Sequence, residues 1–527
     1  MMLAALMVSC SNGKDDGAAW KPGTGGAAPE VDFDVPDKDG MTVKGVVWDS
    51  STGKAMPDVV VSDGRLCTIT DEKGRYWLAT DLSTQRFVFV STPSGYEIPV
   101  RKSSYCFNGY ETLDLGTEEV QQFDFSLKPV SGASDRYQVL FCGDPQISSN
   151  QKGSHAAYED VVNSLIKYKD ETDLPLYIIN LGDVTFDDAD ENAVVKQYLG
   201  RIGIPTMNIP GNHDQFCAQN TNYPPIVDES YSPDYRATAY YCRDFGPNNY
   251  SVNIGKIHYI FIDNIFWWGN NWAEEKNGFD EEVLSFIEND LRYVDKNTPL
   301  MIMTHSPSAN DVIGPDFRQW MLNYDKFIDL LAGYDVMNWS GHLHISGHYV
   351  YDDDDMAKIG CKALSLESHV VSRCAGALYI DCEITSDGVP RGFIIMDVDG
   401  KKTSWTYRRT RIWENGNDQM QIYTPEDTED GYVYANVFLH DNTWGTPQWY
   451  ENGELKGQMQ LYTEKDPMYQ KEYDKYVAAG SPDPNVGKPG PYDTRHLFRI
   501  RPSDGCTSGE VRVTDRFGKE WTQTCTW

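Results

Sequence analysis

Aspartate, asparagine and histidine side chains, which are common metal ligands in proteins, stand in five short polar clusters along this sequence. Each cluster follows a run of apolar residues, as expected of a turn at the end of a buried strand. Mixed carboxylate, amide and imidazole donors suit Mn, Fe, Zn or similar divalent ions, so the pattern predicts a metal centre. The clusters are Gly143-Asp144-Pro145-Gln146, Gly182-Asp183, Gly211-Asn212-His213-Asp214, Thr304-His305-Ser306-Pro307 and Gly341-His342-Leu343-His344.

An α/β core would bring these clusters together. Residues 139–141, 176–179 and 300–303 are continuously apolar, as in strands buried on both faces. Apolar residues recur at helical spacing over 158–166 and 283–294. The carboxyl ends of the strands in such a core meet at one crevice, so we expect the five clusters to converge. Their glycines would let the backbone turn sharply off each strand.

In this order the clusters resemble the pattern of the calcineurin-like metallophosphoesterase superfamily: D-x-H, G-D, G-N-H-[DE], a lone H and G-H-x-H. The resemblance covers about residues 137–408. The whole chain resembles the bacterial three-domain members of this superfamily. It implies an α/β fold whose core is two mixed β-sheets, sandwiched and flanked by helices, with a small N-terminal β-sandwich and a C-terminal β-rich domain.

The resemblance also implies two divalent or trivalent metal ions, with Mn, Fe or Zn favoured and Mg a further candidate. Asp183 would bridge both ions. Asp144 and His344 would bind the first ion, together with Gln146, which stands where the common pattern has histidine. An amide oxygen is a harder and usually weaker donor than imidazole, which leaves the metal identity open. The second ion would be bound by Asn212, His305 and His342.

Two further residues have implied roles in catalysis. His213 would face the scissile phosphate without binding a metal ion, and Asp214 would orient its imidazole. Asp187 and Asp188 follow the second cluster closely enough to support the site, and the sequence assigns neither of them a role.

The implied activity is hydrolysis of a phosphate ester by a hydroxide that bridges the metal ions, with His213 stabilising charge or protonating the leaving oxygen. The motifs do not distinguish a phosphomonoesterase, a phosphodiesterase and a nucleotide-sugar pyrophosphatase from one another. The expected substrate is a small-molecule, lipid or sugar phosphate ester. The alternative from another class is a surface-anchored ligand- or glycan-binding protein on a phosphatase scaffold, which the intact ligand set disfavours. The aromatic loop 265–272 either stacks on a substrate or packs against an accessory domain, and both interpretations stay open.

The length and composition of the chain indicate its domain organisation and its expected partners. A chain of 527 residues suggests about three domains. A net charge of −33 repels polyanions, which excludes nucleic acid as the expected partner. Short β runs between Asp/Gly turns predict the N-terminal sandwich, and the polar stretch 464–494 in the β-rich C-terminal part predicts a surface excursion. The predicted units are 1–36 (signal and tether), 37–130 (β-sandwich), 131–410 (catalytic domain) and 411–527 (C-terminal β-rich domain).

The N-terminus predicts export. Residues 3–10 form a short apolar segment that ends in Ser9-Cys10 and resembles the lipobox of bacterial lipoproteins, followed by a flexible tether to about Pro36. We therefore expect a membrane-anchored lipoprotein, lipidated on Cys10, in the periplasm or on the cell surface. The alternative is an untidy N-terminal tail with a chance cysteine. Cys217–Cys242, Cys374–Cys382 and Cys506–Cys525 are candidate disulfides of an exported protein.

Overall fold

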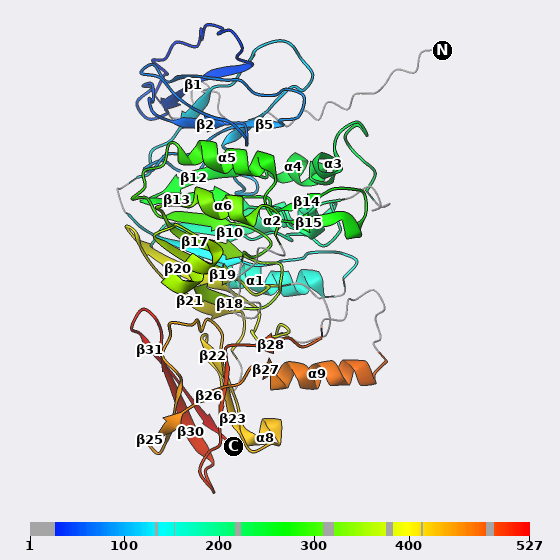
Figure 1. The fold of residues 1–527 in the computed structure, drawn as a ribbon, viewed down its shortest axis with the longest axis vertical. Helices are drawn as coiled ribbons and strands as arrows, with labels where there is room; N and C mark the ends of the chain where they lie inside the picture. Colours follow the sequence, from blue (N-terminus) through cyan, green and yellow to red (C-terminus); the bar gives the residue numbers. More distant parts are fainter. Residues whose placement is uncertain are drawn as a thin grey trace.

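Three units follow one another along the long axis of the molecule (Figure 1). A small β unit lies at one end, a larger α/β unit in the middle and a second β-rich unit at the other end. The computed structural model describes residues 27–131, 135–151, 153–216, 223–308, 321–375, 383–412, 415–480 and 490–527.

The N-terminal unit is a sandwich of two sheets around a core of its own. One sheet contains β1 (Val43–Asp49), β4 (Arg75–Leu78), β7 (Gln121–Gln122) and β8 (Phe125–Leu127). The other contains β2 (Val60–Ser62), β3 (Cys67–Ile69), β5 (Phe87–Val90) and β6 (Tyr110–Thr112).

Residues 27–36, which the sequence assigned to the flexible tether, lie against this sandwich. Val35 is buried with Val46 and Trp48, and the Trp77 indole donates to the Pro36 carbonyl at 2.8 Å. The lipobox-like segment with Cys10 lies outside the described residues. Among the described residues, no helix is long and apolar enough to cross a membrane.

Two sheets form the middle of the α/β unit. The first runs β11 (Thr206–Asn208), β10 (Leu176–Asn180), β9 (Arg136–Cys142), β20 (Gly392–Asp399) and β21 (Lys402–Arg409). The second runs β12 (Tyr250–Ile254), β13 (Ile257–Phe261), β16 (Leu300–Met303), β17 (Asp335–Ser340), β19 (Ser365–Val370) and β18 (Gly347–Val350).

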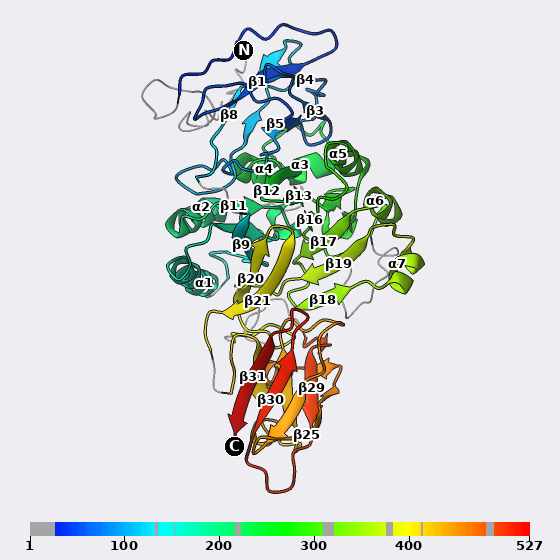
Figure 2. The same cartoon turned by 90° about the vertical axis from the view of Figure 1, so that its left-hand side faces the viewer.

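Helices cover the outer face of each sheet (Figure 2). The first sheet is flanked by α1 (Ser154–Lys169) and α2 (Glu191–Ile202). The second is flanked by α5 (Glu281–Leu291), α6 (Tyr324–Leu330) and α7 (Asp353–Ile359). The short helices α3 (Pro233–Ala237) and α4 (Ala239–Phe245) lie toward the N-terminal unit (Figure 1).

The two sheets pack face to face through large apolar side chains. Every residue of β10 and β16 is buried, which explains their uninterrupted apolar sequences. Phe141 on β9 stacks on Trp339 on β17 with 4.2 Å between ring centroids. Because β9 and β10 are parallel, as are β16 and β17, their carboxyl ends open toward one region between the sheets. This is the α/β sandwich that the sequence predicted.

The C-terminal unit is also built of two main sheets. One contains β22 (Met420–Tyr423), β23 (Val433–Val437), β29 (Leu497–Ile500) and β26 (Gln460–Leu461). The other contains β25 (Glu454–Gln458), β24 (Gln448–Glu451), β30 (Ser508–Thr514) and β31 (Glu520–Thr526). A short pair, β27 (Glu464–Lys465) and β28 (Asp493–Thr494), and the helix α8 (Pro425–Thr428) complete the unit.

The polar stretch 464–494, which the sequence predicted to be a surface excursion, contains the surface helix α9 (Pro467–Ala478). The Asp466 carboxylate accepts from the amides of Met468 and Tyr469, and Pro467 occupies the first helical turn. Tyr469 is fully buried and anchors the helix.

Of the candidate disulfides, one lies wholly within the described residues. Cys506 and Cys525 are free thiols in the structure, so this pair is not bonded. Cys242 and Cys374 are also free, and their proposed partners Cys217 and Cys382 lie outside the described residues.

Candidate metal centre

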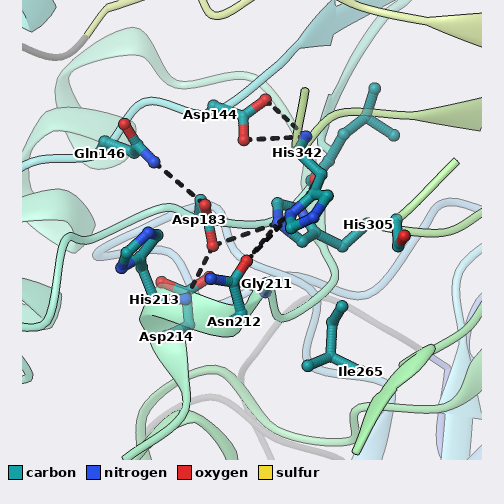
Figure 3. A network of polar contacts seen from close by, with 12 residues as sticks. Asp144, Gln146, Asp183, Gly211, Asn212, His213, Asp214, Ile265, His305 and His342 are labelled. Carbon is teal, nitrogen blue, oxygen red and sulfur yellow. Dashed lines mark hydrogen bonds and ion pairs between the residues drawn. The ribbon is translucent and has the colours of Figure 1, made fainter. Parts of the chain in front are cut away.

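The five polar clusters converge where strands of both sheets end. Those after β9, β10 and β11 come from the first sheet, and those after β16 and β17 come from the second. Figure 3 shows the side chains pointing toward one another across the gap between these turns. Ligand-type atoms of Asp144, Asp183 and His344 all lie within 4.8 Å of one another.

One half of the site lies beside Asp144. The His344 Nε2 is 3.5 Å from an Asp144 oxygen and 3.0 Å from the Gln146 amide nitrogen. That amide nitrogen is also 3.1 Å from Asp183 Oδ2. Asp144, Gln146 and Asp183 are almost completely buried.

The other half lies beside Asn212. Its Oδ1 is 3.1 Å from His305 Nε2 and 3.0 Å from His342 Nδ1, and these two nitrogens are 3.1 Å apart. Asp183 Oδ1 lies 3.3 Å from the same His305 nitrogen. Asp183 thus faces both halves through its two oxygens, as the bridging role requires.

The chemistry of these donors fits a cation. The His305 Nδ1 is 2.8 Å from the Leu181 carbonyl, to which it donates, so Nε2 presents a lone pair to the site. Asn212 Oδ1 and Asp183 Oδ1, which converge on it, are acceptors as well. Burial would lower the pKa of His305, but the Asp183 carboxylate outweighs this and raises it to about 10.

The pKa values of Asp183 and His342 also reflect how closely these side chains lie together. Burial would raise the pKa of Asp183, but the imidazoles of His305 and His213 hold it far below its usual range. Burial and the nearby His305 lower the pKa of His342 to about 3, so His342 is a neutral imidazole, the form that binds metals.

The Gln146 side chain also has an atom that could bind a metal ion. Its Oε1 is buried and has no hydrogen-bond partner among the described residues. The oxygen and nitrogen of an amide are related by a half-turn of the group. That half-turn would place Oε1 between Asp183 and His344, where a donor to the first metal ion belongs. The seven predicted ligands therefore fit a binuclear centre.

His213 lies at the rim of the site, and its contacts correct the predicted role of Asp214. The His213 Nδ1 is 3.1 Å from the Asp187 carboxylate, which therefore orients the ring and leaves Nε2 for a substrate. Burial would lower the pKa of His213, but Asp183 and Asp187 raise it to about 9. The Asp214 carboxylate instead accepts from the backbone amides of Val184, Thr185 and Gly211.

The backbone conformation of the site residues directs their side chains toward the centre. Twelve non-glycine residues of the described chain have positive φ, and half of them are Asp144, Gln146, Asp183, Asp187, His342 and His344. The sharp turns are therefore made by the site residues themselves and not by the cluster glycines alone. Gly182 does adopt a positive φ of 84°. Gly211 has ordinary dihedrals, but a Cβ there would lie 2.2 Å from Asp183 Oδ1, so this glycine provides space.

The loop that carries His342 and His344 is tied to the C-terminal unit. The Ser346 amide donates to Asp387 Oδ2 at 2.6 Å, and the Ser346 hydroxyl donates to the Phe438 carbonyl at 2.6 Å. The same Asp387 oxygen lies 3.1 Å from His496 Nε2. All four residues are buried. Two residues after a predicted metal ligand, the chain is therefore fixed by hydrogen bonds to a neighbouring unit.

Other histidines and arginines of the α/β unit are engaged by residues outside the predicted ligand set. His155 and His258 pair with Glu191 and Asp290, and His348 contacts His369. Arg236 donates to Asn270, and Arg243 pairs with Asp244. Arg373 is buried, and its backbone bridges to Gly143.

Comparisons with known proteins agree with this geometry. The family model for calcineurin-like phosphoesterase matches residues 137–348. The models for the N-terminal and C-terminal parts of calcineurin-like phosphoesterase match residues 41–130 and 371–521. A search of curated proteins gave no match.

Three solved structures are similar in part. A purple acid phosphatase from yellow lupin (Lupinus luteus) seeds is 14% identical, with a TM-score of 0.37, over 54% of this chain and 53% of that one. A Thermus thermophilus protein is 12% identical, with a TM-score of 0.29, over 52% and 100%. A 5′-nucleotidase precursor from the same organism is 13% identical, with a TM-score of 0.28, over 52% and 54%. This chain spans about half the length of the lupin phosphatase and of the nucleotidase precursor. By its three family models, the chain belongs to the calcineurin-like phosphoesterases.

Proposed function

We propose that this protein hydrolyses a small phosphate ester at a binuclear centre, with water as the nucleophile and no covalent phosphoenzyme. One observation carries the proposal. Seven oxygen- and nitrogen-donor side chains from five strand ends meet around Asp183, and a histidine that is not among them stands at the rim. The donors are Asp144, Gln146, Asp183, Asn212, His305, His342 and His344.

The predicted metal ligands and His213 have different roles in the proposed reaction. Two bound cations would activate water and neutralise charge on the phosphoryl oxygens. Asp183 holds the two halves of the site in register, because its oxygens face Gln146 on one side and His305 on the other. His213, with Nδ1 fixed by Asp187, presents Nε2 to the substrate, where it donates a proton to the leaving oxygen.

The finer assignments are part of the same proposal. The candidate substrate classes are phosphomonoesters, phosphodiesters and pyrophosphates such as a nucleotide-sugar. Mn, Fe or Zn is the expected metal, with Mg as a further candidate. We also propose that the protein is exported and anchored through a lipidated Cys10, which the Ser9-Cys10 pattern in the sequence supports.

Metal quantification combined with a substrate panel tests the function. Purified protein, reconstituted in turn with Mn, Fe, Zn and Mg, is analysed for metal content and assayed with phenyl phosphate, bis(4-nitrophenyl) phosphate and a nucleotide-sugar. We expect two ions per chain and hydrolysis of at least one of the three esters, which identifies the substrate class. Asp183→Asn should lose both, because it removes a charge that faces both halves of the site. A wild-type protein that binds no metal ion, or that binds two and hydrolyses none of the esters, would refute the proposal.

A further inference from the structure

Three tryptophans near the metal centre have different environments. They belong to a hairpin formed by β14 (Ile265–Trp267), the short 3-10 helix η2 (Trp272–Glu274) and β15 (Glu275–Asn277). Trp267 is 2% exposed, and its indole donates to Gln215 Oε1 at 2.8 Å, so it is a packing residue. Trp268 and Trp272 are 61% and 45% exposed. Packing therefore does not account for all of the aromatic residues here.

Trp272 lies next to His213. The two ring centroids are 5.9 Å apart, with 48° between the ring planes. Trp272 also packs edge-on against the buried Trp267, with centroids 5.1 Å apart. Phe186 stacks on His213 with centroids 4.1 Å apart. The imidazole that faces the substrate therefore has aromatic neighbours on two sides, and Trp272 is the more exposed of them.

Hydrogen bonds fix the turn that carries Trp272. Asn271 Oδ1 accepts from the Ala273 amide at 3.0 Å, and Glu274 Oε2 accepts from the Asn270 amide at 3.0 Å. The Trp268 amide donates to the Glu274 carbonyl, also at 3.0 Å. The indole is therefore held in place before any ligand arrives, so stacking on it costs little conformational entropy.

The position of His213 determines what the indole can contact. Nδ1 is engaged by Asp187, so a leaving oxygen protonated by His213 must lie next to Nε2. A ring joined to that oxygen directly, or through a few bonds, comes within reach of the neighbouring indole. The acidic residues Asp187, Glu274 and Glu275 in this region disfavour a second negative charge on the leaving group.

We propose that Trp272 is a stacking platform for an uncharged aromatic ring in the leaving group, either an aryl group or the base of a nucleoside monophosphate. This inference rests on the proposed function, because it concerns the substrate of the same site. Trp272 would then determine specificity by binding the part of the ester that departs, while the metal centre binds the phosphoryl group.

The test compares each ester with itself across variants, so that differences in chemical reactivity cancel. Wild type, Trp272→Ala, Trp272→Phe and the control Trp268→Ala are loaded with the same metal. They are assayed for kcat/KM with phenyl phosphate, adenosine 5′-monophosphate, glucose 6-phosphate and ethyl phosphate. Binding of phenylphosphonate and methylphosphonate, which are not hydrolysed, is measured by calorimetry as a readout independent of turnover.

Trp272→Ala should lower kcat/KM for at least one aromatic ester by roughly tenfold to a hundredfold, the usual loss of one stacking partner. Ethyl phosphate should change by less than about threefold. Phenylphosphonate should bind more weakly by a similar factor while methylphosphonate does not, Trp272→Phe should restore most of the loss, and Trp268→Ala should resemble wild type. A loss confined to phenyl phosphate or to the nucleotide identifies the source of the ring.

Two outcomes overturn the inference and leave the proposed function intact. An equal loss for ethyl phosphate means that Trp272 acts only by supporting His213. An equal loss for glucose 6-phosphate means that the platform does not select aromatic rings. If the wild type hydrolyses no ester at all, the proposed function fails, and the phosphonate affinities still decide whether Trp272 stacks on aromatic rings.

Discussion

The contact between Asp387 and Ser346 predicts that a residue far from the predicted ligands in sequence controls metal affinity. Asp387 is 1% exposed, and its Oδ2 accepts the Ser346 amide at 2.6 Å and pairs with His496 at 3.1 Å. Asp387→Ala would leave the Ser346 N–H buried without an acceptor. A hydrogen bond to a charged group contributes about 1.5–3 kcal/mol, so losing these two lowers the free energy of unfolding by about 3–6 kcal/mol.

Part of this loss should appear as weaker metal binding. Ser346 follows His344 by two residues, so a loosened loop no longer holds that imidazole opposite Asp144. Removing a residue that orients a metal ligand typically costs about tenfold to a hundredfold in metal affinity. We expect Asp387→Ala to lose that much affinity for one of two ions, measured by competition with a chelator and by elemental analysis.

Glu451→Ala is the matched control. Glu451 is a buried carboxylate as well, but it lies in the C-terminal unit, and its Oε1 accepts from Ser503 N at 2.8 Å and from the Trp449 indole at 2.9 Å. It should lower stability by a similar amount without changing metal affinity. If Asp387→Ala unfolds more easily but binds both ions as tightly as wild type, the loop does not depend on this contact and the reasoning is refuted.

Three further predictions concern single side chains. His213→Ala should retain both metal ions and lower kcat by about two to four orders of magnitude, because it removes the proton donor and no ligand; a kcat within a few fold of wild type would remove His213 from the mechanism. Gln146→His should slow the loss of the first metal ion to a chelator, because imidazole is the stronger donor, and faster loss would contradict the assignment of Gln146 as a ligand. Glu367→Gln should lower the free energy of unfolding at pH 7 and should make it depend less on pH in the acidic range. Burial would raise the pKa of Glu367, but His369 and Arg516 lower it to about 2 from an ordinary 4.5. This shift corresponds to about 3 kcal/mol of stability, which is present above pH 4.5 and is lost as the pH falls toward 2. Urea unfolding at pH 7 and at pH 3 measures this, and an unchanged pH dependence would contradict it.

The convergence of the five clusters could be predicted because each cluster carries a local signal. An apolar strand followed by a Gly-Asp, Asn-His or His-x-His turn is visible within about ten residues. The parallel pairing of β9 with β10 and of β16 with β17 then brings the strand ends together without any further information. Helix α9 had a comparable local signal in Asp466-Pro467, which the polar composition of its surroundings obscured.

The positioning residues lack such a signal. Asp214 directly follows His213, yet three backbone amides of neighbouring turns occupy its carboxylate. The orienting role falls to Asp187, which reaches His213 because residues 184–187 fold back beside Ile147. Asp387 is 41 residues from the Ser346 amide that it accepts. Contacts of this kind depend on how loops pack in three dimensions, and spacing along the chain does not encode them.

The loops of the centre hold one another in place, which explains why so many ligands tolerate an unfavourable backbone. A positive φ in a residue other than glycine costs about 1–3 kcal/mol and persists only where surrounding contacts enforce it. Here the Asp144 carboxylate accepts the His342 amide, with 3.0 Å to each oxygen, and the Asp183 carbonyl accepts the Gln146 amide at 2.8 Å. Asp183 Oδ1 also accepts the His213 amide at 2.9 Å. Each carboxylate thus serves as a predicted ligand and as the anchor of another ligand-bearing turn. Loss of one carboxylate therefore removes a donor and releases a second ligand, so metal affinity should fall cooperatively and not one donor at a time.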